Sequence, residues 1–287
     1  MYSLSRPIVS ASEAYALAVS AIKKKDARVP YYNAKNLVAA KCDAFDLLAE
    51  RNDLHLAVGS EYDIAGLDGA KMVELYDKQF TSRATTADLK DGIKNAAPNS
   101  LCPYCGQGYV FELDHYLPKT SFAGTSVHPA NLVPCCSDCN FAKRAYIPGE
   151  ADPAVLHPYF DVDAFNVQWL VATLERGALE TARVTFGVQL PQPDDLLAAR
   201  LHRHLKVFKL QERFRAWAAQ ALNNFEILLT TNEGMSMTLE QAEQHLRRNA
   251  ISLSGGRVNS WERATYTAMA QSDWYLRDKL GLPDTNG

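Results

Sequence analysis

The sequence has no apolar run of the roughly 18 residues that a membrane-spanning helix requires. An early apolar stretch, residues 14–22, follows Glu13 and precedes three lysines, which reverses the charge order of a secretory signal peptide. Without an export signal, cysteines are expected to stay reduced and to serve as metal ligands rather than as disulfide partners. We therefore expect a cytoplasmic protein that does not enter a membrane.

The sequence also lacks an excess of positive charge. Its 30 Lys and Arg residues stand against 33 Asp and Glu residues, which gives a formal net charge of −3. A protein that binds nucleic acid unaided usually carries a basic excess, so any contact with phosphate groups is expected from a local basic patch or from a partner. No internal repeat or low-complexity tract is present, and the 47% hydrophobic content predicts an ordinary globular fold.

The spacing of apolar residues predicts a mostly helical α+β protein in which helical N- and C-terminal regions surround a small central module. The three predicted regions are 1–97, 98–147 and 148–287. Helical periodicity and capping signals in the first region predict helices at about 12–25, 33–51, 68–80 and 86–96.

The third region begins with a turn-rich linker at residues 147–153. Two strand-like segments follow, 165–174 and 183–190, and they could pair as a hairpin through Gly177. From about residue 194 to residue 281 the pattern returns to helix, with breaks near 230–234 and 252–258.

Four of the six cysteines form two Cys-x-x-Cys pairs, and these pairs frame the central module. They are Cys102, Cys105, Cys136 and Cys139. Each pair supplies two thiolates from one tight turn, and four thiolates suit a tetrahedral structural Zn²⁺. Cys135 is the spare cysteine beside the second pair, and Cys42 lies among the apolar positions of a predicted helix, where it is interpreted as a small buried hydrophobe.

The residues between the two pairs predict a strand, a loop, a second strand and a short helix. Residues 109–113 form the first predicted strand, which ends at Asp114 and His115. The short helix follows Pro134, with Ser137 or Asp138 as its cap. This order would bring together four polar side chains: Asp114, His115, Asn131 and Asn140. Glu112 lies two residues before Asp114 and therefore on the same face of the strand. It is a candidate neighbour of a metal ion bound by Asp114.

Residues 101–143 resemble the HNH (ββα-metal) nuclease family in its version with a structural zinc, a treble-clef-like module. The resemblance rests on the two cysteine pairs together with Leu113-Asp114-His115-x-x-Pro118-Lys119, Asn131-Leu132-x-Pro134 and Asn140-x-x-Lys143. The pieces are weak singly and specific in combination. They cover the central module and leave the rest of the 287 residues unmatched.

The resemblance implies a hydrolase, a divalent-metal-dependent endonuclease that cleaves DNA. Asp114 and Asn140 would bind a catalytic Mg²⁺ or Mn²⁺, since hard cations prefer oxygen ligands. His115 would act as general base on the attacking water, because neutral imidazole is available near pH 7. Asn131 would orient the ring of His115 by a hydrogen bond.

Basic residues in two places are candidates for contact with the nucleic acid. Lys119, Lys143 and Arg144 lie within the central module. Residues 199–215 carry six Lys or Arg residues and two His against one acidic residue, with apolar residues at near-helical spacing. We expect one amphipathic helix here that presents a basic face. The candidate phosphate contacts on it are Arg203, Lys206 and Lys209.

The chain is similar to stand-alone bacterial HNH proteins that act with a partner protein, often an ATPase, in defence against phage or other foreign DNA. The acidic net charge agrees with such a partner. Two alternatives stay open. The substrate could be RNA, since the motif grips a single phosphate, or the module could be a non-catalytic, zinc-stabilised domain that binds nucleic acid or protein.

Overall fold

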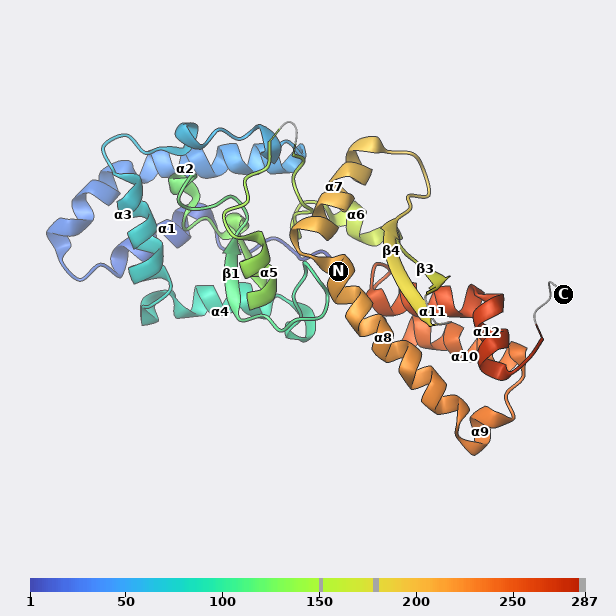
Figure 1. Ribbon diagram of the computed structural model, residues 1–287. Coiled ribbons are helices and arrows are strands. Elements are labelled where there is room, and N and C mark those ends of the chain that lie inside the picture. Colours follow the sequence, from blue (N-terminus) through green and yellow to red (C-terminus); the bar gives the residue numbers. More distant parts are fainter. Residues whose placement is uncertain (150–151, 178–180, 284–287) are drawn as a thin grey trace. The chain divides into compact units, whose positions relative to one another are not determined.

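The computed structural model describes residues 1–149, 152–177 and 181–283. Within these residues the chain is mostly helical, with two small antiparallel sheets (Figure 1), which confirms the predicted α+β class. The chain forms two compact units. One is Tyr2–Val162, which we call the N-terminal unit, and the other is Asp163–Gly287 with Met1, which we call the C-terminal unit. Among the described helices, none has the length and apolar character to cross a membrane.

The N-terminal unit contains five α-helices and one two-stranded sheet in its described part. They are α1 (Ala11–Ser20), α2 (Val29–Glu50), α3 (Gly69–Glu74), α4 (Ala87–Asn95), β1 (Glu112–His115), β2 (Leu132–Cys135) and α5 (Ser137–Lys143). A π-helical turn, η4 (Leu75–Phe80), continues α3. The predicted regions 1–97 and 98–147 thus both belong to this unit.

The first two helices begin earlier than predicted, each for a local reason. Ser10 caps α1 and forms a capping box with Glu13, so this helix begins at Ala11. Pro30 lies in the gap between the first two predicted helices, but it belongs to the first turn of α2. A proline is tolerated there because the first backbone N–H groups of a helix have no intrahelical acceptor.

The core of the N-terminal unit joins the helical region to the small sheet. The same cluster of buried side chains includes Val19 of α1, Val38 of α2, Phe80 of η4, Leu113 of β1 and Leu132 of β2. Burial of such side chains stabilises each by about 1.5–3 kcal/mol relative to exposure. The sheet that carries the candidate site residues therefore rests on the helical core.

The sheet of the N-terminal unit is antiparallel and short. Its register pairs Glu112 with Cys135, Asp114 with Val133, and His115 with Leu132. Helix α5 packs against β1 (Figure 1). Asp114 and His115 lie within β1 rather than beyond its end, and α5 begins directly after Cys136 without a side-chain cap, so the predicted cap was wrong.

The C-terminal unit contains a β-hairpin and helices. Its elements are α6 (Val162–Asn166), which starts at the unit boundary, β3 (Leu170–Arg176), β4 (Ala182–Val188), α7 (Asp195–Val207), α8 (Leu210–Leu229), α9 (Asn232–Met235), α10 (Leu239–Ser252), α11 (Trp261–Gln271) and α12 (Asp273–Leu280). The two predicted strands do pair, from Leu170 with Val188 to Arg176 with Ala182. The predicted turn begins at Gly177, and residues 178–180 lie outside the described residues.

Two sequence predictions for the C-terminal unit were wrong in detail. Phe165 was expected in a strand, but it is buried in helix α6. Residues 199–215 were expected to form one helix, but the chain breaks at Lys209, whose φ is 52°. In a continuous helix, residues two apart point in directions about 200° apart. The break instead lets Phe208 and Leu210 both be fully buried.

Candidate zinc centre and adjoining pocket

The four predicted cysteines converge to one buried cluster. The sulfur atoms of Cys102, Cys105, Cys136 and Cys139 all lie within 4.8 Å of one another. The Sγ atoms of Cys105 and Cys136 are 3.9 Å apart. A tetrahedral zinc site with Zn–S bonds of about 2.3 Å separates its sulfurs by about 3.8 Å. The cluster therefore has the donor set and the spacing to bind zinc.

Glycines after the first cysteine pair make this convergence possible. Gly108 donates its N–H to Cys105 Sγ at 3.4 Å and accepts from the N–H of Cys102 at 2.7 Å. A Cβ atom on Gly108 would lie 2.6 Å from Cys136 Sγ, so only glycine lets the two halves of the cluster approach this closely. Gly106 has a φ of 76°, in the left-handed region that the knuckle turn requires.

The other two cysteines, Cys42 and Cys135, are buried and lie outside the cluster. Cys42 lies on the buried face of α2 and is 2% exposed. Its Sγ lies 3.8 Å from the carbonyl oxygen of Gly124. Burial raises the pKa of the Cys42 thiol, so it stays protonated. Within the cluster the thiols hydrogen-bond to one another, which lowers the pKa of Cys105 and Cys136 and raises that of Cys139, while burial raises the pKa of Cys102.

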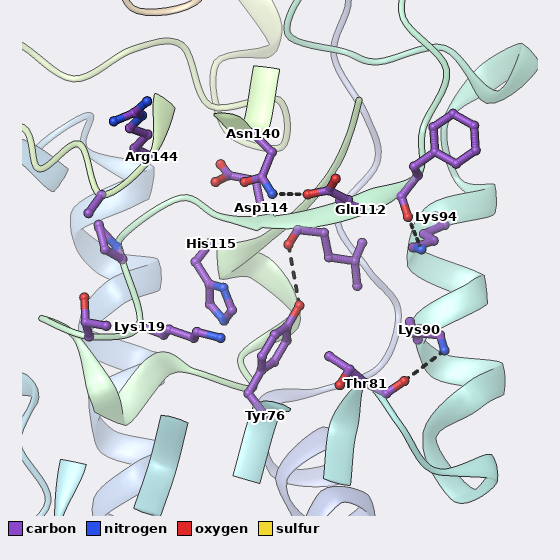
Figure 2. A pocket seen from close by; sticks show the side chains of 15 residues that line it. Tyr76, Thr81, Lys90, Lys94, Glu112, Asp114, His115, Lys119, Asn140 and Arg144 are labelled. Carbon is purple, nitrogen blue, oxygen red and sulfur yellow. Dashed lines mark hydrogen bonds between the residues drawn. The ribbon is translucent and has the colours of Figure 1, made fainter. Parts of the chain in front are cut away.

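The central module, residues 98–147, carries the cysteine cluster, and we call it the zinc module from here on. Next to it lies a pocket of about 540 Å³ (Figure 2). Its walls come from β1 and α5 and from α4 and η4 of the helical region. Its polar lining comprises two carboxylates, a histidine, an amide and four cations: Glu112, Asp114, His115, Asn140, Lys90, Lys94, Lys119 and Arg144. The structure thus brings three of the predicted residues, Asp114, His115 and Asn140, to one surface.

His115 is held in one ring orientation. Its Nε2 lies 2.8 Å from the carbonyl oxygen of Ser126. Because a carbonyl only accepts hydrogen bonds, Nε2 carries the proton and Nδ1 is the acceptor nitrogen. The ring of Tyr76 packs edge-on against the imidazole at 4.3 Å between centroids. Burial lowers the pKa of His115 to about 3, so the ring is neutral near pH 7.

Asn131 does not make the predicted contact with the His115 ring. It is fully buried, and its side chain bonds to both the N–H and the carbonyl of Leu117, at 2.7 and 3.0 Å, and to Thr125 Oγ1 at 3.1 Å. These bonds close the loop between β1 and β2. Ser126, which holds His115, directly follows Thr125, so Asn131 acts on His115 through the loop.

Asp114 is buried in an ion pair with Lys143. The Lys143 ammonium lies 3.1 Å from Oδ1 and 3.0 Å from Oδ2, and the Tyr104 hydroxyl donates to Oδ2 at 3.0 Å. Burial raises the pKa of Asp114, and the positive charge of Lys143 opposes that rise. Lys143 is only 2% exposed and also donates to the carbonyl of His115, so its prediction as a phosphate contact was wrong.

Glu112 and Asn140 link β1 to α5 at the pocket wall. The amide of Asn140 donates to a carboxylate oxygen of Glu112, as Figure 2 shows beside Asp114. Glu112 is partly exposed, in contrast to the buried Asp114. The pocket therefore contains oxygen donors from two carboxylates and one amide.

Four cations surround these donors, and the sequence predicted two of them. Lys119 pairs with Asp77 and lies over the Tyr76 ring, and Arg144 is exposed at the end of α5. Lys90 and Lys94 were missed. Both lie on α4, four residues apart and therefore on one helix face, as Figure 2 shows. That spacing is common on solvated helices, so the sequence alone does not assign these lysines to the pocket.

The remaining predicted nucleic-acid contacts belong to the C-terminal unit. Arg203 and Lys206 lie on α7, and Lys209 lies at the break between α7 and α8. Lys206 and Lys209 are exposed, and Arg203 is partly buried. They are not among the residues that line the pocket.

Comparison with curated proteins finds similarity to a phage protein. The chain is 27% identical over 232 residues to Protein ea31 of Escherichia phage lambda, an alignment that covers 75% of this chain and 76% of that protein. No family model matches the sequence. No solved structure matches it either.

Proposed function

We propose that this protein is a divalent-metal-dependent endonuclease of the HNH type that hydrolyses phosphodiester bonds of DNA. One observation carries the proposal. Asp114, His115 and Asn140, which come from a strand and a helix of the zinc module, line a single pocket whose rim is cationic. Lysine and arginine side chains of this kind contact nucleic-acid phosphates.

The oxygen donors of the pocket fit a hard divalent cation. Glu112, Asp114 and Asn140 supply carboxylate and amide oxygens, the ligand types that Mg²⁺ and Mn²⁺ take together with water. Bound there, Mg²⁺ or Mn²⁺ would stabilise the charge that develops on the scissile phosphate and on the leaving oxygen. The cysteine cluster would hold Zn²⁺ as a structural ion.

The residues around this donor set have separate tasks in the proposed reaction. His115 would take a proton from the attacking water at Nδ1, since Nε2 is committed to the Ser126 carbonyl. Asn131 would keep the loop that carries this carbonyl in place. Lys119 and Arg144 would bind phosphate oxygens on either side of the scissile bond.

We also propose a role in defence against foreign DNA, with a protein partner such as an ATPase that supplies targeting or control. The net charge of −3 supports a partner, because unaided DNA-binding proteins are usually basic. Co-purification with the product of a neighbouring gene tests this role. The proposed role of a partner would be refuted if the purified protein, without any partner, both cleaved DNA and distinguished foreign DNA from other DNA.

Cleavage of a supercoiled plasmid by the purified, zinc-loaded protein tests the nuclease proposal. We expect nicking with Mg²⁺ or Mn²⁺, none with EDTA, and none in His115→Ala. His202→Ala is the matched control, because His202 is an exposed histidine on α7 of the C-terminal unit. Equal zinc content in all variants excludes unfolding. Metal-dependent cleavage of RNA alone would favour the RNA-cleaving alternative, and inactivity on both substrates, with the partner present, would favour the binding module.

A further inference from the structure

The zinc module exposes aromatic rings to an unusual degree. Three aromatic side chains among the described residues show more than half of their surface to solvent: Tyr109 (64%), Phe111 (67%) and Phe141 (68%). All three lie between the first cysteine pair and the end of α5. Large apolar side chains are normally buried, so a concentration of exposed rings in one small module indicates a surface that binds something.

Two of these rings adjoin cations of the pocket. Phe111 itself lines the pocket, and its carbonyl accepts a hydrogen bond from Lys94. Phe141 follows Asn140 on α5, and the guanidinium of Arg144, which lines the pocket, lies 4.5 Å from the centroid of its ring. The Phe141 ring thus stacks on one cation of the pocket, and the backbone of Phe111 holds a second cation of the pocket beside it.

Exposed rings beside cations match the chemistry of an unpaired nucleic-acid strand. Each base of a single strand offers a π-face to an aromatic side chain while its phosphate meets a lysine or arginine. In a duplex, by contrast, neighbouring bases cover these faces and leave only base edges and the backbone accessible. An apolar protein partner would not need the four cations of the rim.

We propose that Phe111 and Phe141 stack on unpaired bases that flank the scissile phosphate, so that the preferred substrate is single-stranded or locally unpaired DNA. The proposal rests on the proposed nuclease function for the assignment of the pocket. Tyr109 lies two residues before Phe111 on the segment that leads into β1, and its ring is exposed as well.

Binding without cleavage tests this inference separately from the nuclease proposal. Zinc-loaded protein, without added Mg²⁺ or Mn²⁺, is titrated against a labelled single strand, its duplex, and a duplex with an internal unpaired bubble, with fluorescence anisotropy as the readout. We expect tighter binding to the single strand and the bubble. Phe111→Ala and Phe141→Ala should each weaken single-strand binding by about 5- to 150-fold, the effect of losing one base stack.

The matched control is Tyr32→Ala, which removes a ring that is 49% exposed on α2 and should leave binding unchanged. Phe111→Trp should retain binding, because it keeps a stacking face. A strand that contains 2-aminopurine provides a direct signature, since its emission falls when the base stacks, and this fall should be lost in Phe111→Ala. Unchanged zinc content and circular dichroism show that each variant is folded.

Two results would overturn the inference: equal binding to duplex and single strand, or single-strand binding that neither phenylalanine variant weakens. Tighter binding to single-stranded RNA than to DNA of the same sequence would overturn the assignment to DNA. Single-strand binding that depends on both rings, in a protein that cleaves neither DNA nor RNA with Mg²⁺ or Mn²⁺ and its partner present, would refute the nuclease proposal and leave the stacking surface established. Cleavage by a protein that binds unpaired strands no better than duplex would support the nuclease proposal and refute the stacking surface.

Discussion

Replacement of Lys143 by methionine should strongly destabilise the N-terminal unit. Lys143 and Asp114 form a buried ion pair in which the two side chains are 0% and 3% exposed. Methionine has a similar length and no charge, so within the described part of the chain the variant leaves Asp114 with the Tyr104 hydroxyl as its one side-chain donor. Removing one member of a buried ion pair typically costs about 3–5 kcal/mol, because the other charge stays in a poorly solvated place.

Protonation of Asp114 limits this penalty from above. If Asp114 instead took up a proton at pH 7, the cost relative to an unfolded carboxyl with a pKa of about 3.9 would be about 4 kcal/mol, at 1.36 kcal/mol per pH unit. The variant can always take this route. The expected loss in the free energy of unfolding is therefore about 3–4 kcal/mol, a large part of the stability of a typical domain.

Urea denaturation measures this loss, and the distribution of tryptophan assigns it to a unit. The tryptophans all lie in the C-terminal unit: Trp169, Trp217, Trp261 and Trp274. Tryptophan emission therefore follows that unit, whereas far-ultraviolet circular dichroism follows the helices of both. A shift in the circular-dichroism transition that tryptophan emission does not share places the loss in the N-terminal unit.

The double variant Asp114→Asn with Lys143→Met is the matched control. It removes both charges and keeps a polar partner for Tyr104, so it should recover most of the stability that the single variant loses. A loss below about 1 kcal/mol in Lys143→Met would place the pair among weak, solvated ion pairs and refute the reasoning. A double variant no more stable than the single one would refute it as well.

Three further predictions concern the zinc centre and the loop beside it. Cys139→Ser should abolish stoichiometric zinc in purified protein, measured by mass spectrometry of the metal content, whereas Cys135→Ser should retain it. Gly108→Ala should lose zinc to a chelator far faster than wild type, because its Cβ would overlap Cys136; an unchanged rate would contradict the close approach. Asn131→Ala should lower the free energy of unfolding by about 1–3 kcal/mol for each buried backbone group left unpaired, measured by urea denaturation, and a loss below about 0.5 kcal/mol would show that the loop does not depend on it.

Local spacing made the zinc centre and part of the pocket predictable from the sequence. Two Cys-x-x-Cys pairs define two tight turns wherever they occur, and a strand followed by a loop, strand and helix returns Asn140 to the strand that carries Asp114 and His115. The pattern indicates which residues come close. It does not indicate which atoms bond, so it gave Asn131 a partner in His115 and gave Lys143 a place at the surface, both wrongly.

Tertiary packing decided the features that the sequence did not reveal. No glycine or proline lies beside Lys209, so the sequence does not predict the helix break there. The break exists because Phe208 and Leu210 are both buried in the core. Lys90 and Lys94 read as ordinary solvated lysines of a short helix. Only the docking of α4 beside the zinc module brings them to the pocket.

The pocket also shows why the predicted regions 1–97 and 98–147 form one unit. Tyr76 of η4 contacts the His115 ring and donates to the carbonyl of Leu113 at 3.5 Å. Lys94 of α4 bonds to the carbonyl of Phe111, and Leu132 of β2 belongs to the core of the helical region. The cysteine cluster joins the two turns of the module, but one wall of the pocket is helical. A fragment limited to 98–147 would keep the four cysteines and lose that wall, so metal binding and the proposed chemistry should separate in it.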